Sequence, residues 1–199
     1  DGMLAYVPFT IIASVFLIIA YIPIPAYENF ITSILNVENA GVWQGKLIYV
    51  SNATMDVGAL YVLIAATYSL AKYYNTDKLQ ATLTSLAAFL VVTPYVFGDN
   101  GGNIPMTKVG AQAMFLAIIV SIVSVEVYRK IEQKGIVIKM PAAVPPAVAK
   151  PFASIIPAFI SITLFYIVRL TLEITMSSDL FTVINTIVGK PLLLLGGTL

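Results

Sequence analysis

The stretch VPPAVAKPFASIIPAF, residues 144–159, holds four prolines and runs directly into a long apolar segment. Pro145 and Pro146 favour extended backbone, because a proline restricts its own φ and the conformation of the residue before it. Pro151 suits the first turn of a helix, whereas Pro157 lies inside the apolar run and is expected to kink a helix there. The sequence therefore predicts a stiff approach to a kinked helix. The alternative, a plain helix start with one tolerated proline, stays open.

Composition indicates a membrane protein. Of the 199 residues, 59% are hydrophobic and only 11% are charged, and the mean hydropathy is +0.91. A soluble domain carries about 25% charged residues. The net charge of +1 gives no basic surface of the kind that binds nucleic acid. The chain has no Cys and no His, so we expect no catalytic residue of the Ser-His-Asp or Cys-His kind, no metal site and no cofactor.

Five apolar stretches approach the roughly 20 residues that a membrane-spanning helix needs. We therefore expect an all-α fold, a bundle of about five transmembrane helices. The five stretches are residues 3–22, 47–70, 79–97, 111–128 and 152–176.

Lysine and arginine are distributed unevenly between the loops. Positive residues favour the cytoplasmic side of a membrane, so the loops after spans two and four are expected to be cytoplasmic, and the N-terminus with them. Those two loops hold Lys72, Lys78, Arg129, Lys130, Lys134, Lys139 and Lys150, whereas the loops on the opposite side hold Lys46 and Lys108.

The pattern changes after the fifth span. Apolar residues between Leu180 and Val188 recur at helical spacing and predict a short amphipathic helix along the membrane interface, ended by Gly189 or Pro191. We accordingly expect a five-span subdomain (residues 1–176), a linker helix (177–190) and the start of a further transmembrane helix (191–199). The last segment is too short to span, so the chain is expected to be part of a longer protein.

Asp56 is the ionisable residue expected near the middle of the second span. A charged group at membrane depth is costly and points to function, and Asn52 precedes it by one helical turn, so the two can line a polar path. The alternative is that the helix starts near Val57 and that Thr54 or Asp56 caps it.

The segment between spans three and four is rich in glycine and polar residues. Asn103, with Asp99 and Asn100, can bind sugar hydroxyls, although a solvated turn explains the same residues. Gly110 opens span four and allows a helix or a ligand to approach closely. Further along the chain, Arg169 and Glu173 can pair within the bundle, or they can extend to the interface while forming a weak i, i+4 helical pair.

Several stretches resemble one family, the membrane permease subunit (enzyme II C) of the sugar phosphotransferase system, in its lactose, cellobiose and N,N'-diacetylchitobiose branch. The most specific is MPAAVPPAVAKPFASIIPAFI (residues 140–160), which departs from the family's pattern at Pro151, where a small polar residue is expected. The others are DGMLAYVPFTIIASVFLIIAYIPIP (1–25), VGAQAMFLAIIVSIVSVEVYRKI (109–131) and VGKPLLLLGGTL (188–199).

The resemblance implies the N-terminal half of a ten-helix permease that works as a homodimer in the bacterial cytoplasmic membrane. It implies uptake of a β-linked disaccharide, which a phosphocarrier partner subunit phosphorylates, while most of the sugar site, with a functional His and Glu, lies in the second half. Two other functions stay open: an ion-coupled transporter that uses Asp56, and a membrane scaffold that transports nothing.

Overall fold

The structure is a computed structural model that describes residues 2–98, 101–141 and 143–196, with side chains described as far as residue 188. The regular secondary structure of its described part is helical apart from one hairpin, in which β1 (Val96–Gly98) pairs antiparallel with β2 (Gly101–Asn103). The expectation of an all-α membrane bundle is confirmed. Asp99 and Asn100, two of the polar residues singled out in the sequence, lie outside the described residues.

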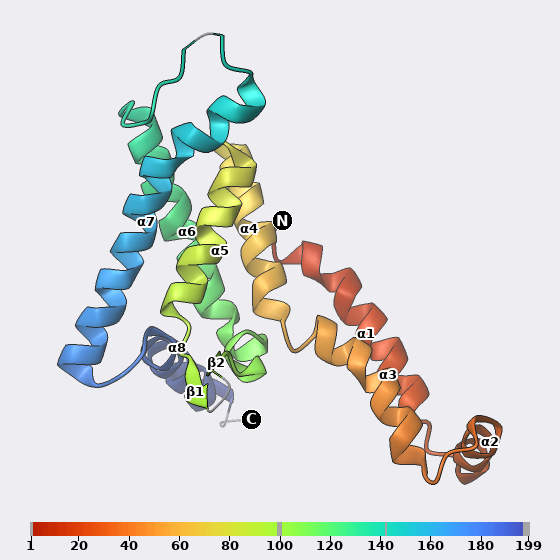
Figure 1. Cartoon of the computed structure of the whole chain (residues 1–199). Helices are drawn as coiled ribbons and strands as arrows, with labels where there is room; N and C mark the ends of the chain where they lie inside the picture. The colour runs from red at the N-terminus through yellow and green to blue at the C-terminus, as the bar shows by residue number, and fades with distance from the viewer. Residues whose placement is uncertain (1, 99–100, 142, 197–199) are drawn as a thin grey trace.

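Four helices pack into a bundle: α4 (Gly58–Tyr73), α5 (Lys78–Val92), α6 (Met114–Gln133) and α7 (Pro146–Met176). Helix α8 (Leu180–Gly196) lies across one end of this bundle beside the β-hairpin (Figure 1). We call this the hairpin end. The opposite end, where the α4–α5 turn and the α6–α7 loop meet, we call the basic end.

Small and aromatic residues from all five helices form the core of the bundle. Alanines let the helices approach closely, as is common between membrane helices. The buried members include Ala59, Leu63, Ala88, Phe89, Leu116, Ala117, Val120, Phe165, Phe181 and Ile184.

The N-terminal helices form an arm beside the bundle. After the 3-10 turn η1 (Leu4–Tyr6), α1 (Val7–Ala20) packs along α3 (Ala40–Thr54), and α2 (Pro25–Leu35) lies at the tip of the arm (Figure 1). The prolines of the sequence IPIP end α1 close to the expected position, and α2 then starts at 92° to the preceding helix. Residues 25–35 were not among the expected helices, because the stretch is too short to span, although Tyr27, Phe30, Ile31, Ile34 and Leu35 recur at helical spacing.

In the part of the chain that the structure describes, three helical stretches are long and apolar enough to cross a membrane: Ala40–Tyr73, which is interrupted after Thr54, Met106–Gln133 and Pro146–Met176. The bent pair Leu4–Ala20 and Pro25–Leu35 adds a fourth if it is counted as one span. Helix α5, in the place of the expected third span, is apolar but has only 15 residues. The bundle is therefore built from membrane helices of unequal length.

Two expected helix ends are wrong. The third span was expected to reach Phe97, but α5 ends at Val92, because Pro94 disfavours helical backbone at Thr93, whose ψ is 130°. The linker helix was expected to end at Gly189 or Pro191, but α8 continues to Gly196. A proline removes one backbone hydrogen bond, and a helix can continue past that loss.

The proline-rich stretch begins its helix earlier than expected. Pro145 stands just before α7 with extended backbone, and Pro146 is the first helical residue, so Pro151 lies inside the helix and not in its first turn. The expectation of an extended approach as far as Pro151 is therefore wrong. Pro157 lies within the helix and is buried, as expected, and Figure 1 shows α7 changing direction in its N-terminal, cyan part.

Polar contacts fasten α7 to its neighbours. The Ser161 hydroxyl lies 3.3 Å from that of Ser124 on α6, and the Ser154 hydroxyl donates to Gln80 Oε1 on α5 at 3.2 Å. Each hydroxyl is small enough to allow close helix packing while satisfying a polar group away from water. These contacts fix the register of α7 along the bundle.

Arg169 joins the far end of α7 to α5. Its Nε donates to Glu173 Oε1 at 2.7 Å, and its Nη1 donates to the Val91 carbonyl at 2.8 Å. Val91 lies in the last turn of α5, where carbonyls have no partner within the helix. Of the two arrangements left open by the sequence, pairing within the bundle is therefore the one observed.

Candidate functional site

The second span is broken in its middle. Helix α3 ends at Thr54 and α4 starts at Gly58, so the expected continuous helix over residues 47–70 is wrong. The break is stabilised from outside the span, because the Ala59 N–H donates to the Val109 carbonyl at 2.9 Å. A long-range contact of this kind could not be inferred from helical periodicity alone.

Asn52 and Asp56 lie on either side of the end of α3. Asp56 lies in the break and is exposed. When the Asn52 side-chain amide is oriented with its nitrogen toward Asp56, this nitrogen lies 3.2 Å from Asp56 Oδ2. No side chain caps α4, whose N-cap is Val57, and the Thr54 hydroxyl donates back to the Val50 carbonyl. The structure thus shows a polar pair at a helix break and not a helix cap.

Gly110 packs directly against this break. A Cβ added to Gly110 would lie 2.9 Å from the Asp56 carbonyl oxygen, which is closer than real Cβ contacts come. Gly110 is buried and precedes the turn η3 (Ala111–Ala113), which leads into α6. The close approach expected at Gly110 is therefore made by the backbone of the second span.

Asp56 and Gly110 line one open pocket of about 430 Å³. The Tyr6 hydroxyl projects here and donates to the Thr54 carbonyl at 3.3 Å, one of the carbonyls that the break leaves without a helical partner. Carboxylate, hydroxyl and amide groups together can bind sugar hydroxyls or water. The other residues of the lining are Thr10, Met55, Met106, Thr107, Ala111, Gln112 and Met114.

Asn103 lies apart from the other candidate residues. It is exposed in β2, where it pairs with Val96 in the hairpin register, and it does not line the pocket at the helix break. The structure therefore brings Asn52, Asp56 and Gly110 together but leaves Asn103 outside.

The proline motif lies at the basic end, beside a second polar cavity of about 300 Å³. The Thr76 hydroxyl donates to Glu132 here, and Lys150 Nζ lies 3.9 Å from Asp77 Oδ2. Pro157 forms part of the wall. Sequence reasoning missed this cluster, since its members come from the α4–α5 turn, α6 and α7.

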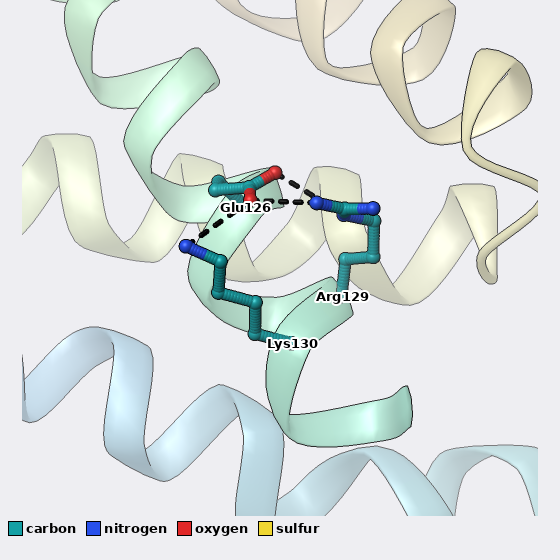
Figure 2. A network of polar contacts seen from close by, with 3 residues as sticks. All are labelled: Glu126, Arg129 and Lys130. Atoms are coloured by element: carbon teal, nitrogen blue, oxygen red, sulfur yellow. Dashed lines mark hydrogen bonds and ion pairs between the residues drawn. The ribbon is translucent and has the colours of Figure 1, made fainter. Parts of the chain in front are cut away.

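A compact ion network marks the same end of α6. Glu126 accepts from Arg129 Nη2 at 2.6 Å and from Arg129 Nε at 3.1 Å, and Lys130 Nζ lies 3.3 Å from Glu126 Oε1 (Figure 2). The Arg129 guanidinium also stacks on Tyr74, 4.4 Å from the ring centre. The spacing of these charges at i, i+3 and i+4 was the signal available in the sequence.

No group of three or more His, Cys, Asp and Glu side chains in the described part of the chain is arranged to hold a metal ion.

Comparison with known proteins covers the chain from end to end. The family model described as phosphotransferase system, EIIC matches residues 1–198. The chain is 40% identical over 208 residues to the cellobiose-specific EIIC component of Geobacillus stearothermophilus and 39% identical over 209 residues to the lichenan permease IIC component of Bacillus subtilis. Each alignment covers all of this chain and 45% of the relative.

One solved structure has the same fold. The transporter ChbC, the IIC component of the N,N'-diacetylchitobiose-specific phosphotransferase system, superimposes with a TM-score of 0.89 and is 38% identical. The match covers 98% of this chain and 47% of ChbC. The chain thus spans about half the length of the relatives that it matches, and it belongs to the EIIC family of the phosphotransferase system, whose members are integral membrane permeases.

Proposed function

We propose that this chain is the N-terminal part of a permease that takes up a β-linked disaccharide. The observation that carries the proposal is the match to EIIC proteins over residues 1–198, together with a structural likeness that extends to 98% of the chain. The relatives named for cellobiose, lichenan and diacetylchitobiose have β-linked sugars in common. In this proposal a phosphocarrier subunit on the cytoplasmic side phosphorylates the sugar as it arrives.

The broken second span supplies part of the sugar's path. Interrupted membrane helices are where transporters expose backbone and polar side chains to a substrate. Asn52, Asp56 and Gly110 meet at such an interruption, beside a pocket lined by both polar and apolar side chains. Asn103 takes part only if the sugar passes the β-hairpin before it reaches that pocket.

In this proposal residues 1–176 form a five-span subdomain and a linker begins at residue 177, although α8 continues past the expected linker end to Gly196. The N-terminus and the basic end face the cytoplasm of a bacterium, and two copies associate through the first subdomain. The exposed apolar side chains of α1 and α2, among them Ile11, Ile18, Phe30 and Ile34, suit contact with lipid or with a second copy.

Uptake by the full-length protein tests this function. Membrane vesicles are supplied with phosphoenolpyruvate and the soluble phosphocarrier proteins, and a panel of labelled β- and α-linked disaccharides is offered outside. We expect phosphorylated β-linked sugar to accumulate only when the phosphate donor is present. Uptake that needs a proton or sodium gradient and gives unmodified sugar would contradict the proposal and favour ion coupling.

A further inference from the structure

A third polar depression lies at the hairpin end, away from both sites described above. Its volume is about 520 Å³, within the range of about 300–1,000 Å³ that small-molecule sites occupy. It lies between the residues that follow α5 and the turn from α7 to α8. The lining consists of Pro94, Tyr95, Arg169, Glu173, Ser177, Ser178, Asp179 and Thr182.

Its central arginine is held rigidly. Arg169 is anchored by the Val91 carbonyl through Nη1 and by Glu173 through Nε, and its side chain is 25% exposed. Within the described part of the chain these bonds leave Nη2 without a partner, and Arg169 is part of the lining of the depression. A guanidinium fixed in this way loses little entropy when it binds a ligand.

The same lining supplies acceptors. Glu173 uses only Oε1 for Arg169, which leaves Oε2, and the Asp179 carboxylate is oriented by bonds from the Thr182 N–H at 2.8 Å and the Thr182 hydroxyl at 3.0 Å. Each carboxylate oxygen has more than one lone pair. The exposed Ser177 hydroxyl can donate or accept.

An aromatic surface closes one side. Tyr95 is 37% exposed and stacks with Phe97, with ring centres 6.4 Å apart and planes 27° from parallel. Aromatic faces of this kind pack against the C–H faces of sugar rings while the hydroxyls of the sugar bond to polar groups.

The charges select a neutral ligand. Two carboxylates and one guanidinium give the depression a net charge of −1, which disfavours the binding of phosphate and other anions. The positive charge of Arg169 disfavours the binding of a metal cation beside it. Mixed donors and acceptors beside an aromatic face suit a hydroxyl-rich ligand. We propose that this depression is a capture site, where one ring of the external sugar binds before it enters the permease. The inference rests on the proposed transport function and on an outward-facing hairpin end.

Cysteine labelling tests the site directly, in a full-length protein from which any cysteine outside these 199 residues has been removed; this chain itself contains none. Ser177→Cys is introduced into the full-length protein in whole cells, and its reaction with a membrane-impermeant maleimide is timed with and without saturating cellobiose. We expect cellobiose to slow the labelling at least fivefold, and sucrose to have no effect. Thr186→Cys, exposed on α8 outside the lining, is the matched control and is expected to label at one rate throughout.

Uptake kinetics give a second measurement. Tyr95→Ala is expected to raise the external sugar concentration that gives half-maximal uptake about tenfold. The maximal rate of uptake, normalised to the amount of protein in the membrane, is expected to stay within twofold of the wild type. Tyr166→Ala, which removes an exposed tyrosine of α7 outside the depression, is expected to leave the half-saturating concentration unchanged. A merely structural role for Tyr95 would lower abundance and maximal rate and leave half-saturation unchanged.

The outcomes separate this inference from the proposed function. If uptake depends on the phosphate donor but cellobiose does not protect Ser177→Cys from labelling, the capture site is wrong and the transport function still holds. Protection by cellobiose without phosphate-dependent uptake supports the capture site and overturns the coupling to phosphorylation.

Discussion

Single residues decide how closely the second span and the start of α6 approach. The identity of Gly110 was informative in the sequence, because a glycine at the start of an apolar span has few uses besides close packing. The partner of Arg169 was not predictable in the same way. Its bond to the Val91 carbonyl joins residues 78 positions apart and depends on where Pro94 ends α5. Local patterns therefore predicted the Arg169–Glu173 pair as a possibility but not the contact between helices.

Gly110→Ala should destabilise the full-length protein. The added Cβ would lie 2.9 Å from the Asp56 carbonyl oxygen and 3.3 Å from the Met106 carbonyl oxygen, so the backbone must shift, at a cost of about 1–3 kcal/mol. Thermal unfolding in detergent, followed by tryptophan fluorescence, measures the loss. Gly45→Ala in α3 is the control, because nothing lies within 4 Å of the added Cβ there. Equal unfolding temperatures for the two variants would contradict the packing described for Gly110.

Arg169→Met should also destabilise the protein, by about 1–3 kcal/mol, since it leaves the Val91 carbonyl without its charged donor. Glu173→Gln removes the ion pair but keeps an acceptor for Arg169, and an i, i+4 pair contributes only about 0.2–0.5 kcal/mol. Thermal unfolding of both variants separates the two contributions. A loss as large in Glu173→Gln as in Arg169→Met would show that the ion pair, and not the bond to α5, carries the stabilisation.

Helices and their ends were predicted with uneven success. The spans over α1, α6 and α7 followed from long apolar runs, because burial in lipid demands such runs whatever the tertiary contacts. The break between α3 and α4 was not predicted as a break, since it is fixed by Val109 and Gly110 from another element. The short helix α2 was missed for a different reason: it is too short to span, so its helical spacing of apolar residues was not counted, and its contact with α3 through the Trp43 Nε1 bond to Thr32 at 3.3 Å is a tertiary one.

Pro157→Ala should straighten the start of α7. The substitution restores a backbone N–H, and the straightened helix would carry Lys150 and Ser154 away from their partners Asp77 and Gln80 on the α5 side. Spin labels at the exposed residues Val148 and Leu79 report the separation by pulsed electron resonance. We expect the distance distribution to move by several Å in Pro157→Ala and to stay in place in Pro146→Ala, where alanine fits the first helical position equally well. An unchanged distance in Pro157→Ala would show that neighbouring helices, and not the proline, bend α7.

The arrangement of charge over the two ends of the bundle was predictable from the sequence, because loop charge depends only on composition and on the order of the spans. Seven of the positive side chains counted in the loops lie toward the basic end, and Arg129, Lys130 and Lys150 make ion pairs there. The positions of the pockets were not predictable, since each combines residues from two or more segments that lie far apart in the sequence.

The expected orientation in the membrane is checked by asking which end of the bundle is accessible from outside the cell. Lys139→Cys lies in the α6–α7 loop at the basic end, and Asn103→Cys lies in the hairpin at the other end; both positions are exposed. In intact cells a membrane-impermeant maleimide should label Asn103→Cys and leave Lys139→Cys unmodified until the cells are opened. The reverse pattern would invert the orientation and place the capture site on the cytoplasmic side.

The shortness of α5 has a consequence for the surrounding lipid. Its 15 residues, bounded by the Asp77 cap and by Thr93 before Pro94, extend only about 22 Å at a rise of about 1.5 Å per residue. A typical hydrocarbon layer is about 30 Å thick, so the bilayer beside α5 must thin or the helices around it must tilt. Hydrophobic mismatch should therefore make the protein sensitive to acyl-chain length. In phosphatidylcholine bilayers of graded chain length, we expect the unfolding temperature to be highest in bilayers thinner than average and to fall as the chains lengthen.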